Sequence, residues 1–203
     1  MSATGLAVLL PVLIAISLAV AWSGKGPVIF RQLRIGQYGR PFEILKFRTM
    51  VVGAANCGPQ ITIGDDPRIT TVGRFLRRFK LDEMPQLVNV LKGDMSLVGP
   101  RPELSVFVDL YPSAQRDLIL SVRPGITDNA SLEFHNESEL LSNVEDPETY
   151  YRQVILPRKC NLYARYAESH TLFHDLVIIA KTISLLVGHG SARADGANGR
   201  PQA

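Results

Sequence analysis

Three patterns in the 203-residue sequence predict a mainly helical α+β fold. An uncharged apolar run opens the chain, two stretches rich in β-forming residues flank a turn, and several later stretches place apolar residues at helical spacing. A chain of this length buries one good hydrophobic core but hardly two. We therefore expect a helix within residues 1–24, one compact domain at 25–187 that includes a β-hairpin, and a disordered tail at 188–203.

The apolar run at residues 6–22 is 17 residues long and uncharged. As a straight helix it would measure roughly 26 Å, slightly less than a ~30 Å hydrocarbon core. A signal peptide would need positive charge before the run, and residues 1–5 supply none. Pro11 favours a helix that enters the membrane, bends and returns, because proline removes a backbone donor. Since proline is also tolerated in spanning helices, the residues alone leave both a spanning and a re-entrant helix open.

The hairpin is predicted from residues 28–34 and 42–48, which are rich in β-branched and aromatic residues. Two glycines and a proline lie between these stretches and mark a turn. Glycine and proline recur through residues 51–67, so this segment is predicted as a loop. The hairpin therefore connects the apolar N-terminal run, through a loop, to the helical part of the chain.

The helices are predicted from apolar spacing and from residues that start or stop a helix. One helix is expected at 72–80, and the next is expected to begin with Asp82 as its N-cap. Pro85 fits the first turn of that helix and Gly93 its C-terminal stop. Further helical patterns occupy 105–122, 146–168 and 171–187. The last of these is strongly apolar, which is typical of a helix that is buried or lies on a membrane.

Charge is unevenly distributed along the chain, although the formal net charge is only +3. Residues 25–101 carry 13 Lys and Arg against 6 Asp and Glu, whereas residues 102–203 carry 9 against 13. A basic half of this kind faces an anion, which could be a phosphate, a lipid headgroup or a nucleic acid. A nucleic-acid-binding domain would leave the apolar run unexplained, so we expect no nucleic-acid partner.

Two adjacent carboxylates, Asp82 and Glu83, are the candidate reactive residues; we call them the acidic pair. At a helix N-terminus the backbone N–H groups and the macrodipole would lower a carboxyl pKa and keep Asp82 anionic. An ionised aspartate can act as a nucleophile, and both carboxylates could bind Mg²⁺. The alternative is structural, with Asp82 a cap and Glu83 a favourable first-turn acid. On the residues alone this alternative is favoured, since Asp is common at N-caps.

Several cations before and after the acidic pair are candidates for binding phosphate. An arginine fork pairs with two phosphate oxygens at once. Arg101 lies between two prolines and Arg123 precedes Pro-Gly, so both occupy rigid backbone. The alternative is a solvated basic face or a surface on anionic lipid, and for Arg101 we favour ligand binding. The candidate substrate-binding residues are Lys46, Arg48, Arg77, Arg101 and Arg123.

Five motifs occur in order along the chain. They are Gly-Pro-Val-Ile-Phe-Arg-Gln at 26–32, Lys-Phe-Arg-Thr-Met at 46–50, Leu-Asp-Glu-Met-Pro-Gln at 81–86, Lys-Gly-Asp-Met-Ser-Leu-Val-Gly-Pro-Arg-Pro at 92–102 and Arg-Pro-Gly-Ile-Thr at 123–127. Together they closely resemble the bacterial sugar transferases, the monotopic phosphoglycosyl transferases that prime glycan assembly on polyprenyl phosphate. The resemblance extends from about residue 6 to residue 187.

This resemblance implies an activity and roles for individual residues. Such enzymes transfer a sugar 1-phosphate from a UDP-sugar to undecaprenyl phosphate and release UMP. Asp82 matches the nucleophile, which forms a phosphosugar-aspartyl intermediate, and Glu83 matches its partner, which is associated with Mg²⁺. Arg77, Arg101 and Arg123 match positions where phosphate or nucleotide contacts are expected.

The resemblance also implies a location and partners. The N-terminal helix matches a re-entrant membrane helix that is broken at Pro11, with both ends on the cytoplasmic face of the inner membrane. The expected partners are the UDP-sugar, polyprenyl phosphate, membrane lipid, downstream glycosyltransferases and a second copy of the chain.

The sequence departs from the family pattern in three ways. Pro11 follows Met1 by only ten residues and is preceded by leucine where the family often has serine. Residues 126–131 differ from the Gly-Trp version of many members, which concerns the choice of sugar. The first departure motivates an alternative function, a weakly active truncated paralogue that acts as a membrane-bound interaction partner in glycan assembly.

Overall fold

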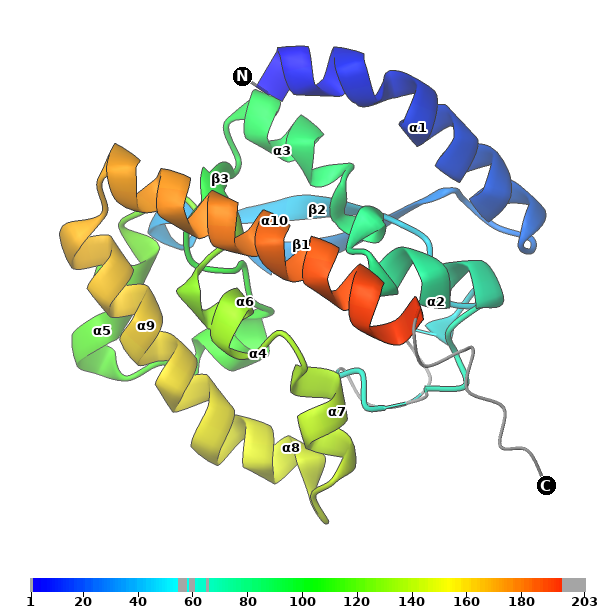
Figure 1. The fold of residues 1–203 in the computed structure, drawn as a ribbon. Helices are drawn as coiled ribbons and strands as arrows, with labels where there is room; N and C mark the ends of the chain where they lie inside the picture. The colour runs from blue at the N-terminus through cyan, green and yellow to red at the C-terminus, as the bar shows by residue number, and fades with distance from the viewer. Residues whose placement is uncertain (1, 55–57, 59–60, 65, 195–203) are drawn as a thin grey trace.

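The computed structural model describes residues 2–54, 58, 61–64 and 66–194 as a mainly helical α+β structure with two small sheets (Figure 1). The strands are β1 (Ile29–Ile35), β2 (Pro41–Phe47), β3 (Ser96–Val98) and β4 (Gly125–Thr127). The α-helices are α1 (Ser2–Trp22), α2 (Thr71–Arg78), α3 (Gln86–Lys92), α4 (Ser105–Val108), α5 (Ser113–Leu120), α6 (Asn129–Glu133), α7 (Glu137–Ser142), α8 (Pro147–Tyr150), α9 (Leu156–Ser169) and α10 (Leu172–Ala194). The described residues also form short 3₁₀ helices, η1 (Gln37–Gly39) and η3 (Leu81–Glu83), and a π-helical turn, η4 (Tyr151–Ile155).

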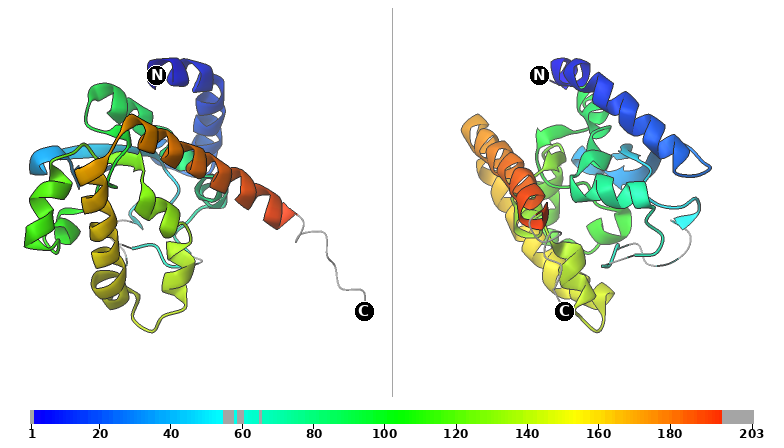
Figure 2. Two further views of the ribbon diagram at one scale, coloured as in Figure 1. Left: turned by 60° about the vertical axis from the view of Figure 1, so that its left-hand side comes forward. Right: turned by 45° about the vertical axis from the view of Figure 1, so that its right-hand side comes forward.

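Helix α1 is bent and lies against α2 and α3, as two views of the ribbon show (Figure 2). Pro11 lies inside the helix and accounts for the bend, because its ring displaces the preceding carbonyl and it has no N–H to donate. Ile16 and Val20 are buried against Phe47 and Leu76. Within the described part of the chain, no helix combines the length and apolarity that crossing a membrane requires. The re-entrant membrane helix therefore stays a prediction.

The β-hairpin is confirmed, with both strands displaced by one residue from the predicted bounds. Strands β1 and β2 are antiparallel, and their register runs from Ile29 opposite Phe47 to Ile35 opposite Pro41. Among the described residues of the predicted loop at 51–67, none belongs to the helices and strands whose bounds are given above. Because α3 packs on β2, the hairpin holds the end of β2 beside the acidic pair.

The helix predicted at 72–80 is confirmed as α2, whose N-cap is Thr70. The Thr70 hydroxyl accepts a hydrogen bond from the Gly73 N–H at 2.9 Å, which satisfies a backbone donor that the helix leaves free. Gly73 also lies against the chain segment that follows β2. A Cβ placed on Gly73 would be only 2.1 Å from the carbonyl oxygen of Thr49. This close contact brings α2, and with it Arg77, next to the chain that follows β2.

The prediction that Asp82 is the N-cap of the next helix is wrong. Lys80 adopts a left-handed conformation with φ of 54°, and Asp82 lies in the 3₁₀ turn η3 that follows it. Helix α3 begins at Gln86, directly after Pro85, which favours a helix start because its φ is fixed and it lacks an N–H. Gly93, with φ of 85°, ends the helix as predicted.

The parallel pair β3–β4 was not predicted, because each strand has only three residues. Ser96 pairs with Gly125 and Val98 with Thr127. At the end of the pair the backbones nearly touch, since a Cβ on Gly125 would lie 2.1 Å from the backbone nitrogen of Gly99. The pair therefore brings the motifs at 92–102 and 123–127 side by side.

The C-terminal half agrees with its predicted helices in part. The single helix predicted at 105–122 is wrong, because α4 and α5 are separated before Pro112, which cannot donate to a preceding carbonyl. The helix predicted at 146–168 is confirmed as the succession α8, η4 and α9. Helices α6 and α7 were not predicted.

Helix α10 extends further than predicted. It was expected at 171–187 but continues to Ala194, so the predicted end is wrong and the predicted tail at 188–203 overlaps the helix. The remainder of that tail, 195–203, lies outside the described residues. Helix α10 contacts β3, β4 and α6, and Ile178 of this helix is buried with Val98 and Tyr166.

Candidate active site

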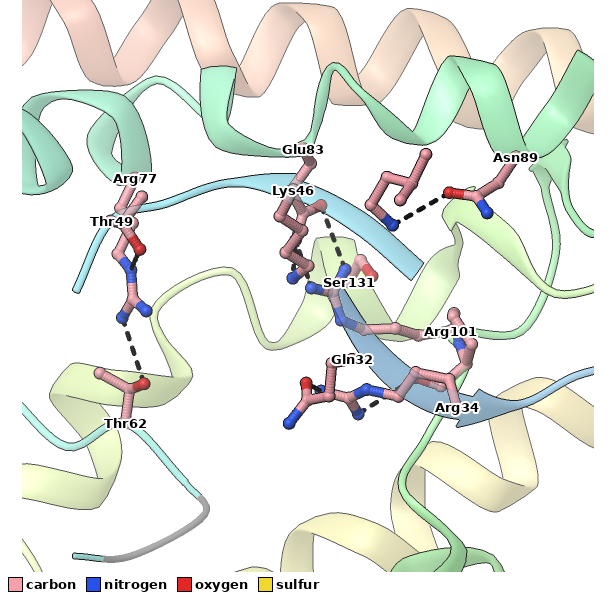
Figure 3. Close-up of polar contacts among 12 residues, drawn as sticks. Gln32, Arg34, Lys46, Thr49, Thr62, Arg77, Glu83, Asn89, Arg101 and Ser131 are labelled. Atoms are coloured by element: carbon pink, nitrogen blue, oxygen red, sulfur yellow. Dashed lines mark hydrogen bonds and ion pairs between the residues drawn. The ribbon is translucent and has the colours of Figure 1, made fainter. Parts of the chain in front are cut away.

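Three segments that are distant in sequence bring two cations onto Glu83 of the acidic pair (Figure 3). Lys46 comes from β2, Glu83 from η3 and Arg101 from the loop that follows β3. Lys46 Nζ donates to Glu83 Oε1 at 2.9 Å. Arg101 Nη1 donates to Glu83 Oε2 at 3.3 Å, and its Nη2 donates to Oε1. Glu83 is buried, with 8% of its surface exposed, whereas Lys46 and Arg101 are partly buried, so the carboxylate at the centre of the cluster is shielded from water.

The cluster holds Glu83 in its ionised form. Burial alone would raise the pKa of Glu83, but Arg101 and Lys46 outweigh it and hold this pKa well below its usual value. Conversely, Glu83 raises the pKa of Arg101 well above the ordinary value. Burial lowers the pKa of Lys46, and Glu83 opposes that change. Glu83 is therefore an anion that orders two cations, and it is a weak base.

Asp82 has the opposite character. It is also buried, at 7% exposure, and its Oδ1 has no hydrogen-bond partner among the residues that the structure describes. Burial, followed by the neighbouring charge of Glu83, raises the pKa of Asp82. The expectation that a helix N-terminus lowers this pKa is therefore wrong, because Asp82 caps no helix and is desolvated instead. A desolvated carboxylate with an unpaired oxygen can attack an electrophile or bind a cation.

Arg77 lies outside the Glu83 cluster (Figure 3). It is close enough to Asp82 for the charge of that residue to act on its guanidinium. Its Nε donates to Thr49 Oγ1 at 2.9 Å and its Nη1 to Thr62 Oγ1 at 3.1 Å. Burial lowers the pKa of Arg77, and the charge of Asp82 opposes that change. Since both partners are neutral hydroxyls, the positive charge of Arg77 is available to an anion at Asp82.

The structure places Arg48 at the C-terminal end of α1. Its Nη2 donates to the carbonyl oxygens of Val20 at 2.7 Å and Gly24 at 2.8 Å, and its Nη1 donates to that of Pro27 at 3.1 Å. A cation at this end also complements the helix dipole. Arg48 thus fastens α1 to the domain and does not join the cluster around Glu83.

Replacing Arg48 with methionine is expected to lower the free energy of unfolding by about 3 kcal/mol, because three carbonyls, the buried one of Val20 among them, lose a charged donor. Urea unfolding followed by circular dichroism measures this loss. Arg40→Met is the matched control: Arg40 is exposed, so its loss is expected to change stability by less than about 0.5 kcal/mol. An Arg48→Met protein as stable as the control would contradict this role.

Arg123 is exposed and forms no side-chain hydrogen bond or ion pair in the described part of the structure. Its backbone oxygen faces Gly99, since a Cβ on that glycine would lie 2.4 Å away. Arg123 is thus attached to the same β3–β4 junction as Arg101 but is not part of the buried cluster.

Two buried residues near the site were not among the functional residues predicted from the sequence. Asp128 accepts hydrogen bonds from the N–H groups of Ala130 and Ser131 at 2.6 and 2.9 Å. Burial raises its pKa, and the hydrogen bonds from Ser131 and the charge of Arg101 oppose that change. Gln86 is fully buried, at 0% exposure, and both polar atoms of its carboxamide are unpaired among the described residues. Its place in the motif at 81–86 was the available signal.

Comparison with known proteins gives the class to which this site belongs. A family model described as "Bacterial sugar transferase" matches residues 1–189. The chain belongs to the bacterial sugar transferase family, which confirms the resemblance carried by the five motifs.

Individual relatives act on nucleotide sugars and undecaprenyl phosphate according to their names. The UDP-glucose:undecaprenyl-phosphate glucose-1-phosphate transferase of Escherichia coli (strain K12) is 44% identical over 138 residues, covering 66% of this chain and 30% of that protein. A protein of the same name from Caulobacter vibrioides is 37% identical over 182 residues, covering 87% and 63%. The UDP-N-acetylgalactosamine-undecaprenyl-phosphate N-acetylgalactosaminephosphotransferase of Aeromonas hydrophila is 35% identical over 184 residues, covering 89% and 40%. The chain spans less than two thirds of the length of each of these relatives.

Proposed function

We propose that this protein is an enzyme that transfers a sugar 1-phosphate from a UDP-sugar to undecaprenyl phosphate and releases UMP. This would be the first membrane step in the synthesis of a polysaccharide or another glycoconjugate. The observation that carries the proposal is the acidic pair, in which Asp82 keeps an unpaired oxygen while Glu83 holds Lys46 and Arg101 beside it. The names of the relatives supply the substrate classes.

The reaction would proceed in two displacements at phosphorus. In the first, a carboxylate oxygen of Asp82 attacks the β-phosphorus, and the bond to the bridging oxygen breaks, so that UMP leaves with that oxygen. In the second, a phosphate oxygen of undecaprenyl phosphate attacks the same phosphorus, and the bond to Asp82 breaks. The products are undecaprenyl diphosphate sugar and a regenerated carboxylate, so two substrates meet in turn at one anion.

The cations around the acidic pair would reduce the repulsion between a carboxylate nucleophile and an anionic phosphate. Lys46 and Arg101 are held in place by Glu83 before substrate arrives, so little reorganisation is needed. Arg77 adds a third charge from α2. The exposed Arg123 would contact the nucleotide or the outer phosphate, as the family pattern implies.

Mg²⁺ is the cofactor in this proposal, and Asp82 fits it because its buried Oδ1 is an unpaired acceptor. Both oxygens of Glu83 already accept hydrogen bonds from Lys46 or Arg101, so Glu83 would bind Mg²⁺ only through an oxygen that it shares with one of these cations. In the described residues no three His, Cys, Asp or Glu side chains group as a metal site, and the phosphates of the substrate would provide further ligands. When bound, Mg²⁺ supplies neutralisation of phosphate charge.

Removing divalent metal with EDTA is expected to abolish UMP release, and added Mg²⁺ is expected to restore it. A second readout is the melting temperature, because a ligand that binds the folded state raises it. Mg²⁺ should increase the rise in melting temperature that UDP-glucose causes. Equal rises with and without Mg²⁺, together with turnover in EDTA, would contradict the requirement.

The proposed location is the cytoplasmic face of the inner membrane, where the lipid substrate would be accessible. Supporting this location, α1 exposes a row of large apolar side chains four residues apart, namely Leu10, Ile14, Leu18 and Trp22. A large exposed apolar patch marks an interaction site, and we propose that α1 dips into the bilayer and returns at the bend near Pro11. Contacts with downstream glycosyltransferases and a homodimer remain further proposals.

The function is tested with purified protein in detergent, undecaprenyl phosphate, Mg²⁺ and a panel of UDP-sugars. UMP release is expected with at least one sugar, and intact-protein mass spectrometry without the lipid acceptor should show a phosphosugar adduct that maps to Asp82. UMP release without an adduct would refute the covalent mechanism. No UMP release with any sugar would refute the proposed activity.

A further inference from the structure

Gln86, the first residue of α3, has a buried polar side chain whose carboxamide is not accounted for by contacts within the protein. Neither polar atom of its carboxamide has a hydrogen-bond partner among the described residues, and unpaired buried groups oppose folding. Asn89, also buried on α3, provides the contrast. Its Nδ2 donates to the carbonyl oxygen of Glu43 at 2.8 Å, and its Oδ1 accepts from the Leu45 N–H at 3.0 Å. The hairpin thus accounts for Asn89 but not for Gln86.

The local backbone directs Gln86 toward the acidic pair. Met84 and Pro85 have right-handed helical dihedral angles, so the chain remains helical from η3 into α3. In a helical segment, residues three or four apart lie on one face, and side chains lean toward the N-terminus. Gln86 follows Glu83 by three residues and Asp82 by four, so its carboxamide leans over the turn that carries both carboxylates.

Three of the cations around this turn are held by contacts within the protein, and the fourth, Lys80, is exposed. Lys46 and Arg101 contact Glu83, and Arg77 contacts two threonine hydroxyls. Asp82 Oδ1 and the Gln86 carboxamide are the buried side-chain atoms of residues 81–86 that remain unpaired in the described structure. A phosphoryl group attached to Asp82 would bring anionic oxygens to a turn where Gln86 Nε2 offers free N–H donors.

We propose that Gln86 is a substrate-contacting residue whose Nε2 donates to a non-bridging oxygen of the phosphoryl group that Asp82 receives from a sugar nucleotide. This inference rests on the proposed function. The amide is neutral, so it adds a directed contact without adding to the positive charge that Lys46 and Arg101 supply. A phosphoryl group that reaches the buried Asp82 Oδ1 would therefore also come within range of Gln86.

The test compares Gln86→Met with the matched variant Asn89→Leu in the full chain. Gln86→Met keeps the side-chain length and removes the unpaired polar atoms, so its melting temperature is expected to equal or exceed that of the wild type. UMP release from the UDP-sugar of the panel that the wild type uses best, and adduct formation with it, are expected to fall about 100-fold, as when one preorganised donor is removed. Asn89→Leu should lower the melting temperature, because it breaks the contacts with β2.

Unchanged UMP release in Gln86→Met would overturn the inference. A fall in its melting temperature as large as that of Asn89→Leu would also overturn it, because Gln86 would then be a packing residue. A wild type that releases no UMP with any UDP-sugar of the panel refutes the proposed function instead, and the rise in melting temperature with Mg²⁺ and the UDP-sugar that stabilises the wild type most then decides on Gln86. A smaller rise in Gln86→Met than in the wild type supports the contact, and equal rises, or none in either protein, overturn it.

Discussion

Asp82→Asn is expected to lower UMP release by at least about 10³-fold and to eliminate the covalent adduct, because an amide oxygen is a poor nucleophile. The fold is expected to be as stable as that of the wild type, or more stable. Asp82 is buried with an unpaired oxygen, and a neutral amide of the same size is easier to desolvate than a carboxylate. The variant therefore separates chemistry from stability.

The stability gain of Asp82→Asn should depend on pH in a defined direction. Burial raises the pKa of Asp82 in the folded state, so the ionised side chain opposes folding above that raised value. Below the ordinary aspartate pKa the side chain is protonated in both states, and the difference vanishes. In thermal unfolding without Mg²⁺, the melting temperature of Asp82→Asn should exceed that of the wild type most near pH 8. The two melting temperatures should become equal below the ordinary aspartate pKa.

A surface aspartate provides the control for this variant. Asp109 forms an exposed ion pair with Arg116 at 3.1 Å, and Asp109→Asn is expected to retain turnover and stability. Full activity in Asp82→Asn would contradict the covalent mechanism. A large loss of stability in this variant would contradict the unpaired environment of Asp82.

Glu83→Gln is expected to lower the free energy of unfolding by about 3–5 kcal/mol and to abolish turnover. Without the carboxylate, Lys46 and Arg101 remain partly buried without a compensating charge, and removing one partner is the costly way to break such an ion cluster. The cations would also lose the anion that fixes their positions. Urea unfolding and UMP release measure the two effects.

Two further variants identify the cause of that loss. In Lys46→Met/Glu83→Gln one uncompensated cation is also removed, so part of the stability should return while activity stays absent. Glu148→Gln breaks an exposed pair with Arg152 at 2.7 Å and is expected to reduce stability by less than about 1 kcal/mol. A Glu83→Gln protein that is no less stable than Glu148→Gln would contradict the stabilising role of the Glu83 ion cluster.

Much of the fold follows from local signals in the sequence. The hairpin, α2, the end of α3 at Gly93 and the helical succession from α8 to α9 were predicted because their signals lie within a few residues of the structure they form. The strands β3 and β4 were missed because three residues carry no usable periodicity. Their pairing also depends on glycines that are 26 residues apart, Gly99 and Gly125.

The sequence by itself determined the family, through five ordered motifs, and singled out the acidic pair and most of the cations that surround it. Only the tertiary structure decided how these residues differ. It gives the adjacent carboxylates opposite pKa shifts, places Arg48 on the end of α1 and leaves Gln86 unpaired. The physical reason is that desolvation and charge depend on which distant segments pack around a side chain. Lys46 and Arg101 approach Glu83 from β2 and from the loop after β3, and no local pattern encodes that approach.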